Sequence, residues 1–257
     1  MENAIYESEP DTSERSLIGD SGVGDPKRIL VFGQRSGGQG VGLSKKVFVD
    51  GTFSLAPPCF SQILVLLAER GDFVLPIAYA LLPDKTALSY RRTLTLIKEA
   101  WPALNPDAVS MDFEIGLKNA FCELFPTAEI HGCLFHLVQN MKKKLKELSL
   151  TSRYNNDPAF ALSARCITSL AFVPPLNLND AIAELAVDLP EELMPVLKYF
   201  EDNYVGPLLH ILPNGSVVRS PPLFPVSMWS VHSRTLNEKA RTNNYAEAAH
   251  RRLHAES

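Results

Sequence analysis

The order of strand-like and helix-like segments between residues 45 and 148 constrains the fold of this chain more than any other feature. Three β-prone apolar runs come first, over residues 45–53, 60–69 and 72–82. The glycine between the last two runs, Gly71, is typical of a hairpin connection. The sequence therefore predicts a sheet that opens as an antiparallel meander.

Helical and strand-like patterns then alternate along the chain. Apolar residues recur at helical spacing over residues 86–101, 113–125 and 137–148. Short strand-like runs over residues 108–112 and 128–135 separate these helices. Strands that are joined through crossover helices pair in parallel, so the sequence predicts an α/β fold with a mixed sheet.

The segments on either side of this region differ from it in composition. Residues 1–44 are predicted to be a disordered or loop-rich lead, because residues 1–26 hold few large apolar side chains. The glycine-rich run at residues 33–42 lacks the spacing of a phosphate-binding loop and is expected to be a flexible connection. Prolines interrupt short helical stretches throughout residues 150–239, which predicts a mostly helical insertion.

Composition limits the classes of protein to which the chain can belong. Its 257 residues, 46% of them hydrophobic, suit one large domain or a core with an insertion. The net charge of −4 predicts that any nucleic-acid site is local rather than a globally basic face. The four scattered cysteines do not form the framework of a small secreted domain. Charged residues divide the apolar segment 60–83 into halves too short to span a bilayer, so no membrane partner is expected.

Two carboxylates occur where an apolar strand would be expected to stay uncharged. Asp50 interrupts the run VFVDGTF, and Asp112 closes the short strand AVSMD. If these strands are neighbours, their spacing of about 4.8 Å brings the carboxylates together, and a hard divalent cation would relieve their repulsion. The alternatives are a turn role for Asp50 with Gly51 and a helix N-cap role for Asp112.

Two glutamates near helix starts also have structural alternatives. Glu114 would lie in the first turn of the helix after Asp112, where the helix dipole favours a negative charge. Glu247 follows Asn244 at the spacing of a capping box, so it either stabilises the start of its own helix or points towards the two aspartates.

Three motifs resemble the transposase domain of Mutator-like elements (MULE). They are FVDGTFSLAPPCF with the strands that follow it, SMDFEIGLKNAFCELFPTAEIHGCLFHLVQNMKK, and RTNNYAEAAHRRLH. The resemblance covers residues 45–148 and resumes over residues 240–254. It implies an RNase H-like mixed sheet flanked by helices, with a mostly helical insertion before the last catalytic helix. The core would span residues 45–149, the insertion residues 150–239, and a truncated last helix residues 240–257.

The resemblance also implies an activity and the residues that carry it. Asp50, Asp112 and Glu247 match the family's acidic triad, and they would be both the catalytic residues and the ligands of Mg²⁺ or Mn²⁺. The reaction would be two-metal phosphoryl transfer that cuts and joins DNA. The expected partners are the DNA of element ends and of the target, together with further copies of the chain, and the expected location is the nucleus.

Further residues are candidates for DNA contact or for structural roles. Cys133 and His136 match a Cys-x-x-His element of the family, and packing or substrate positioning is favoured over zinc because no second ligand pair occurs at familiar spacing. Basic residues on two segments either form solvated helix faces or contact DNA phosphates: Lys142, Lys143, Arg241 and Arg251. Trp229 is either a buried core residue or a platform for an unpaired base.

A second interpretation has no catalysis. Nothing before Lys45 has a Cys/His framework for DNA recognition, and the net charge is acidic. These features are also compatible with a shortened copy, or with a domesticated, non-catalytic nuclear module that binds DNA or protein. The intact acidic triad favours the transposase.

Overall fold

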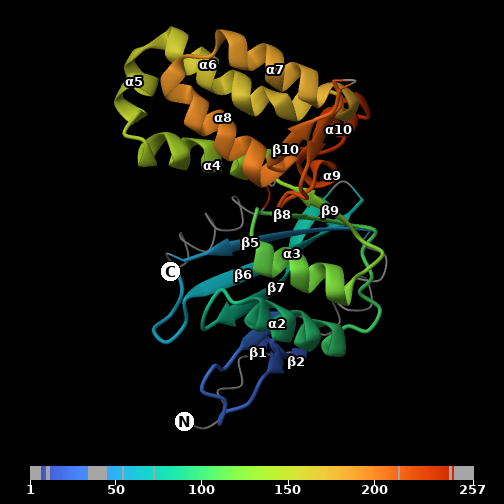
Figure 1. The fold of residues 1–257 in the computed structure, drawn as a ribbon. Coiled ribbons are helices and arrows are strands. Elements are labelled where there is room, and N and C mark those ends of the chain that lie inside the picture. The colour runs from blue at the N-terminus through green and yellow to red at the C-terminus, as the bar shows by residue number, and fades with distance from the viewer. Residues whose placement is uncertain are drawn as a thin grey trace. The chain divides into compact units, whose positions relative to one another are not determined.

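A computed structural model of the chain (Figure 1) describes residues 7–9, 12–33, 45–53, 55–71, 73–213, 215–242 and Tyr245. The chain divides into two compact units. The first comprises residues 1–130 and 243–257, and the second comprises residues 131–242. None of the described helices is both long and apolar enough to cross a membrane.

A mixed sheet of seven strands, counted over the described residues, organises the first unit. Its order is β3-β4-β7-β6-β5-β8-β9. Strands β5 and β8 pair in parallel, whereas β5, β6 and β7 form the predicted antiparallel meander. The strands are β3 (Leu17–Asp20), β4 (Leu30–Gly33), β5 (Lys46–Thr52), β6 (Gln62–Arg70), β7 (Phe73–Leu82), β8 (Ala108–Met111) and β9 (Glu129–Gly132).

Helices α2 (Ala87–Ala100) and α3 (Ile115–Leu124) pack against each other, and α2 also packs on β3, β4 and β7 (Figure 1). Helix α2 begins after Thr86, whose side chain accepts a hydrogen bond from the backbone N–H of Ser89. Gly116 allows the close approach of the two helices, because a Cβ at that position would lie 3.2 Å from the backbone nitrogen of Ala87. The predicted α/β fold, a mixed sheet flanked by helices, is therefore confirmed, and it is consistent with an RNase H-like fold.

The central strands β5 and β6 are apolar because both of their faces are buried. One face carries a cluster of Phe48, Val65 and Leu67, all of which are almost inaccessible to solvent. Residues at the alternate positions, such as Val49 and Leu66, are equally buried on the opposite face. Any charged side chain in these strands therefore lies in a region that would normally exclude it.

The predicted N-terminal lead over residues 1–44 is wrong for residues 17–33. Strands β3 and β4 form a hairpin that joins the sheet, and β4 pairs with β7 from Leu30↔Leu81 to Gly33↔Ala78. This hairpin packs on the sheet with few apolar residues, because two of them, Ile29 and Val31, are fully buried. The glycine-rich run falls mostly in residues 34–44, which lie outside the described residues. Strands β1 (Glu7–Glu9) and β2 (Thr12–Arg15) form a separate pair.

Ion pairs from distant segments hold the connection between β3 and β4. Arg92 on α2 pairs with Asp25, and Lys27 pairs with Asp84 at 2.8 Å. Arg28 forms a further pair with Asp20 at 2.6 Å. The charged residues that made this segment look disordered in the sequence are thus engaged with one another and with α2.

The second unit is mostly helical, as predicted, but it begins at residue 131 and ends at residue 242 rather than spanning 150–239. Helix α4 belongs to it because Leu137, Met141 and Leu145 are buried and the helix packs on α6 and α8. The helices are α4 (Leu134–Glu147), α5 (Thr151–Asn156), α6 (Pro158–Ser169), α7 (Leu178–Asp188), α8 (Met194–Phe200), α9 (Val226–Trp229) and α10 (His232–Leu236). Short 3-10 turns occur at Leu170–Phe172, Pro175–Asn177 and Glu191–Leu193.

A π-helical turn over Glu201–Val205 extends α8 and ends at Gly206. Gly206 has a φ of 109°, and a Cβ there would lie 2.0 Å from the carbonyl oxygen of Ser220. This close approach precedes a small hairpin of β10 (Leu208–Ile211) and β11 (Val217–Arg219). Only glycine therefore fits between the turn and the hairpin.

Candidate active site

Asp50 lies inside β5 rather than at its end. Pairing of β5 with β6 continues beyond it, through Gly51↔Leu64 to Thr52↔Ile63. The side chain is only 7% exposed, and its Oδ1 accepts a hydrogen bond from the backbone N–H of Gly51 at 3.1 Å. The alternative of a turn at Asp50 and Gly51 is therefore wrong, because both residues belong to a paired strand.

Asp112 follows β8 directly, and β8 is the parallel neighbour of β5. The last pair of the printed register is Phe48↔Ser110, and each aspartate lies two residues beyond a member of this pair. Continuing the register therefore sets Asp112 beside Asp50 on the same face of the sheet, because side chains alternate along a strand. One carboxylate thus belongs to β5, and the other directly follows the strand that pairs with β5.

The N-cap alternative for Asp112 is wrong. Helix α3 begins at Ile115, and its N-cap residue is Glu114, whose side chain makes no capping hydrogen bond. Asp112 instead accepts a hydrogen bond through Oδ1 from the backbone N–H of Phe113 at 2.5 Å. The carboxylate is half-buried and lies between the end of a strand and the start of a helix.

A buried hydrogen-bond chain that the sequence did not reveal reaches this edge from the interior. Gln62 at the start of β6 donates through Nε2 to the hydroxyl of Tyr90 at 2.8 Å. That hydroxyl donates to Oε1 of Glu114, also at 2.8 Å. Gln62 and Tyr90 are fully buried, and Glu114 is half-buried. The expectation for Glu114 from sequence was only a favourable interaction with the helix dipole.

Electrostatic interactions couple this series of hydrogen bonds to Asp112. Burial raises the pKa of Glu114, the hydrogen bond from Tyr90 and the charge of Lys85 oppose that rise, and the charge of Asp112 adds to it. Burial also raises the pKa of Tyr90, to which the negative charges of Glu114 and Asp112 contribute. The hydroxyl of Tyr90 therefore stays protonated at neutral pH and remains a donor to Glu114.

The ring of Tyr245 contacts the same face of the sheet. The rings of Phe48 and Tyr245 meet edge to face, with centroids 5.6 Å apart. Phe48 precedes Asp50 by two residues in β5, and Tyr245 precedes Glu247 by two residues in the sequence. Glu247 itself lies outside the described residues, as does Arg251.

The carboxylates of this edge have the chemistry of a site for a hard divalent cation. Mg²⁺ and Mn²⁺ prefer carboxylate oxygens and are held in proteins by few of them. Within the described part of the chain, no group of three or more His, Cys, Asp or Glu side chains is arranged to hold a metal ion. Asp50 and Asp112 therefore fit as part of such a site, and the third predicted ligand, Glu247, is not among the described residues.

The second unit holds the other predicted residues. Cys133 is fully buried immediately before α4. His136 is half-buried, and the centroid of its ring lies 5.4 Å from that of Phe135. The guanidinium of Arg234 donates to the carbonyl of Gly132, the residue before Cys133, at 3.3 Å. Burial lowers the pKa of Arg234 to about 10, so the group remains charged at neutral pH. This arrangement is compatible with the predicted packing role of Cys133.

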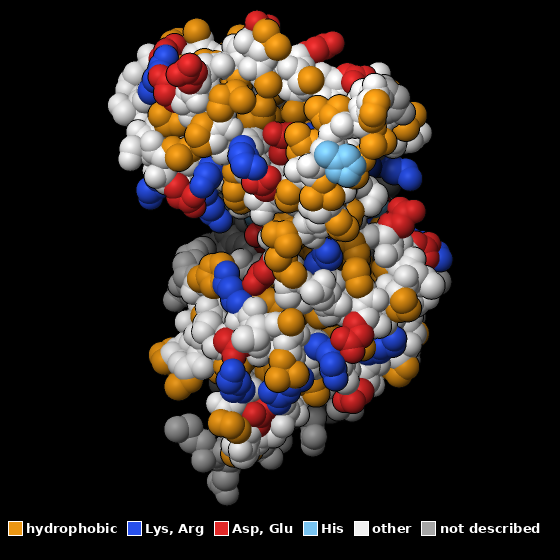
Figure 2. All heavy atoms as spheres, viewed as in Figure 1, with side chains coloured by type: hydrophobic (Ala, Val, Ile, Leu, Met, Phe, Trp, Pro, Cys, Tyr) orange, Lys and Arg blue, Asp and Glu red, His pale blue; other side chains and the backbone are white. Residues whose placement is uncertain are grey.

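The predicted basic residues of the second unit are exposed. Lys142 and Lys143 project from α4, and Arg241 is exposed near the end of the unit, where its carbonyl accepts from the N–H of Leu134. Lys144, by contrast, pairs with Glu147 at 3.1 Å. On the face drawn in Figure 2, basic and acidic side chains are interspersed, in keeping with the weakly negative net charge.

The proposed stacking role of Trp229 is wrong. Its side chain is 1% exposed, and its Nε1 donates to the carbonyl of Tyr204 at 2.6 Å. Its ring also meets that of Phe200 edge to face, with centroids 5.1 Å apart. A ring that is enclosed on all sides cannot stack on a base, and Trp229 is a core residue of the second unit.

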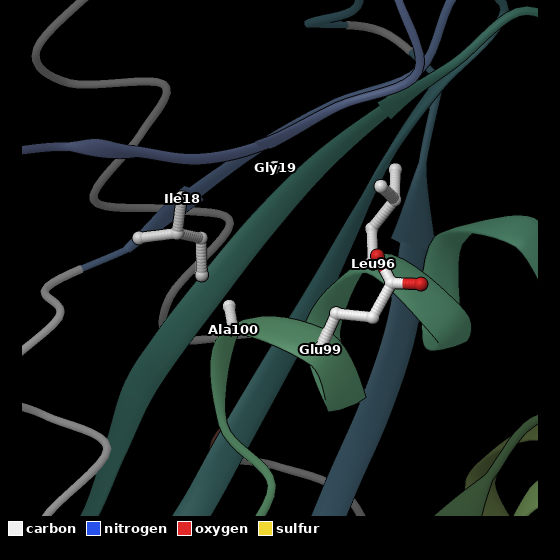
Figure 3. A pocket seen from close by; sticks show the side chains of 5 residues that line it. All are labelled: Ile18, Gly19, Leu96, Glu99 and Ala100. Atoms are coloured by element: carbon white, nitrogen blue, oxygen red, sulfur yellow. The ribbon is translucent and has the colours of Figure 1, made fainter.

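A pocket of about 290 Å³ lies elsewhere in the first unit, between β3 and the C-terminal half of α2 (Figure 3). Ile18 and Gly19 line it from the strand, and Leu96, Glu99 and Ala100 from the helix. Glu99 is the one charged side chain among these lining residues. A single carboxylate beside aliphatic groups does not provide a catalytic constellation, so this pocket is not the candidate site.

Comparison with known proteins finds a similarity, which lies in this region. Residues 46–140 match the family model described as the MULE transposase domain. No curated protein matches the chain. The matched residues begin with β5 and end within α4, so they include Asp50, Asp112, Cys133 and His136. Residues 46–140 of this chain are therefore similar to a MULE transposase domain.

Proposed function

We propose that this chain is the catalytic domain of a DDE-type transposase that cuts and joins DNA by two-metal phosphoryl transfer. Asp50, Asp112 and Glu247 are the proposed metal-binding carboxylates. The observation that carries the proposal is the parallel register of β5 and β8, whose continuation by two residues sets Asp50 beside Asp112. The match of residues 46–140 to the MULE transposase domain supports a transposase-related function.

The burial of Asp50 supports a metal-binding role. A carboxylate in a paired, otherwise apolar strand costs free energy unless its charge is compensated. Each carboxylate is oriented by a hydrogen bond from the following backbone N–H. A bound pair of Mg²⁺ ions would lower the pKa of an attacking water or 3′-hydroxyl and stabilise the leaving oxygen.

The residues of the chain would hold the metals, orient the phosphodiester and provide charge for the DNA backbone. Metal-assisted transfer needs no covalent protein intermediate, so the chain does not require an activated serine or cysteine. The exposed Lys142 and Lys143 are candidates for phosphate contacts, and such contacts make binding weaken as salt is added. DNA and divalent cations are thus the proposed partners, the nucleus is the proposed location, and assembly of several copies is proposed from the family alone.

The test is nicking of supercoiled plasmid DNA in Mn²⁺ and in Mg²⁺, with binding followed in parallel by gel shift. We expect nicking by the parent chain and its loss in Asp50→Asn and in Asp112→Asn. Asp107→Asn is the matched control, because Asp107 is an exposed aspartate near the start of β8 that pairs with Lys45 at 3.2 Å.

Equal nicking by the parent and by Asp50→Asn would overturn the proposal, because the activity would then come from another site or from a contaminant. Salt-dependent DNA binding without nicking in either metal would overturn catalysis and would favour the non-catalytic DNA-binding module. Addition of EDTA supplies the check on the metal requirement.

A further inference from the structure

A small pocket, of about 130 Å³, lies between α4 and α5 in the second unit. Its lining comes from both helices: Lys142 and Leu145 from α4, and Thr151, Tyr154 and Asn155 from α5. Residues that are three or four positions apart lie on the same face of a helix. Each helix therefore presents one face to the pocket, and the buried Leu145 supplies its apolar part.

The connection between the two helices is short and fixed. Ser149 has a φ of 60°, in the left-handed region, which turns the chain sharply after α4. Across this turn the N–H of Leu150 donates to the carbonyl of Leu145 at 2.9 Å. Helix α5 is also tied to a distant segment, because its Arg153 pairs with Glu192. The two helix faces are thus held beside each other without a ligand.

The polar side chains that line the pocket are unpartnered in the described part of the chain. None of the following makes a hydrogen bond or an ion pair with a described residue: the ammonium of Lys142, the hydroxyls of Thr151 and Tyr154, and the amide of Asn155. Asn156 differs, because its amide donates to the carbonyl of Ser152 at 2.8 Å. An apolar surface with a few free polar groups around it is the usual lining of a ligand site.

The charge around the pocket is positive, although the chain as a whole carries a charge of −4. Residues 142–157 hold five Lys or Arg side chains and two Asp or Glu, a net charge of +3. Both acidic side chains are engaged, Glu147 with Lys144 and Asp157 with Arg153. Three exposed lysines of α4 have no acidic partner among the residues that the structure describes: Lys142, Lys143 and Lys146. The ligand that this surface attracts is therefore an anion.

We propose that this pocket binds one unpaired nucleotide of a DNA strand. The base would lie against Leu145 and the ring of Tyr154, Lys142 would contact the adjoining phosphate, and Thr151 and Asn155 would form hydrogen bonds with the base or the sugar. A base inside a duplex is stacked on its neighbours and cannot enter such a pocket, so the ligand is single-stranded or locally opened DNA. The inference rests on the proposed function, because it takes DNA as the substrate.

The test measures binding of a labelled single-stranded oligothymidine to the full chain by fluorescence anisotropy, with EDTA present so that no metal ion contributes. We expect Tyr154→Ala to raise the Kd for the single strand about tenfold, because it removes the ring on which the base stacks. Tyr154→Phe keeps that ring and should bind the single strand more tightly than Tyr154→Ala. The Kd for a duplex of the same length should be the same in Tyr154→Ala and in the parent.

Neighbouring asparagines supply a matched pair of variants. Asn155→Ala removes a side chain that lines the pocket, and Asn156→Ala removes the same chemical group one position away. Asn155→Ala should weaken binding of the single strand, and Asn156→Ala should leave it unchanged. Thermal melts of every variant report stability. Because Asn155 is exposed and unpartnered among the described residues, Asn155→Ala tests the pocket even if Tyr154→Ala loosens α5.

The outcomes separate failure of the pocket from failure of the proposed function. If the parent nicks plasmid DNA while Tyr154→Ala and Asn155→Ala bind the single strand as the parent does, the pocket is refuted and the proposed function stands. If the parent binds neither the single strand nor the duplex, both are refuted. Displacement of the single strand by an equal concentration of thymidine monophosphate would show that the pocket takes a free nucleotide, and would overturn its assignment to a DNA strand.

Discussion

Replacement of Gly51 by alanine tests how tightly β5 is fitted to the buried amide beside the candidate site. The Cβ of the new residue would lie 3.0 Å from Oε1 of Gln62, a contact too short for a carbon and an oxygen atom at rest. The amide cannot swing away freely, because its nitrogen is bonded to Tyr90 at 2.8 Å and its side chain is fully buried. The backbone at Gly51 is not in the left-handed region, so the contact alone decides the cost.

The magnitude follows from two contributions. Overpacking a well-packed core by one methyl group costs about 1–3 kcal/mol. If Gln62 moves instead, it loses its hydrogen bond to Tyr90, which is worth about 0.5–1.5 kcal/mol. Either response gives a destabilisation of about 1–3 kcal/mol, and the second response also releases Tyr90 from its partner.

The assay is urea unfolding followed by far-UV circular dichroism, together with hydrogen exchange read by mass spectrometry on peptides from β5 and β6. Gly24→Ala is the matched control, because a Cβ on Gly24 meets no atom within 4 Å. We expect Gly51→Ala to lose stability and protection in β5 and β6, and Gly24→Ala to stay within about 0.5 kcal/mol of the parent. A Gly51→Ala chain that is as stable and as protected as the parent would refute the inference that the amide is locked.

Three further predictions concern other parts of the chain. Hydrogen bonds from Ser21 and Arg92 lower the pKa of Asp25 to about 2, from an ordinary value near 4. The stability that these hydrogen bonds contribute should be fully present above pH 4 and should fade as the pH falls towards 2. In thermal melts taken between pH 5 and pH 2, Asp25→Asn should therefore lose less stability than the parent. In a fluorescence-anisotropy titration, the double variant Lys142→Glu with Lys143→Glu should bind DNA more weakly and reduce the slope of log K against log salt by about 2. The control Lys198→Gln, which removes a lysine paired with Asp202, should leave that slope unchanged. Trp229→Phe should destabilise the second unit by about 1–3 kcal/mol, because it loses a hydrogen bond and side-chain volume. If peptides of α8 keep the hydrogen-exchange protection of the parent, Trp229 is not a core residue.

The central strands could be predicted from the sequence because their burial is continuous. Strands β5 and β6 carry buried apolar residues on both faces, so the apolar pattern is strong along most of each strand. The hairpin of β3 and β4 could not be predicted in the same way. Its charged residues form ion pairs with distant partners, such as Asp25 with Arg92, which are 67 residues apart in the sequence. Local amino-acid composition does not indicate ion-pair partners that lie so far apart in the sequence.

The residues of the candidate site could likewise be predicted only in part. Asp50 and Asp112 stand out in the sequence because each is a charge at an apolar strand, and the strand order predicts that they meet. Tyr90 and Gln62 do not stand out, because each fits an ordinary helix or strand position. Their connection to Glu114 exists only in the folded chain, where residues 28 and 24 positions apart are joined by hydrogen bonds. Sequence patterns thus identify the charged groups of the edge but not the neutral groups that orient them.

The two aspartates are held with different rigidity, and this difference bears on how the edge would accept a metal. Asp50 is fixed from both sides, because β5 remains paired with β6 for two residues beyond it. Asp112 lies between the last residue of β8 and the start of α3, outside both elements. A cation that binds both would therefore take its position from Asp50, and Asp112 would adjust to it. The hydrogen bond from Tyr90 to Glu114 then limits how far the segment between β8 and α3 can move.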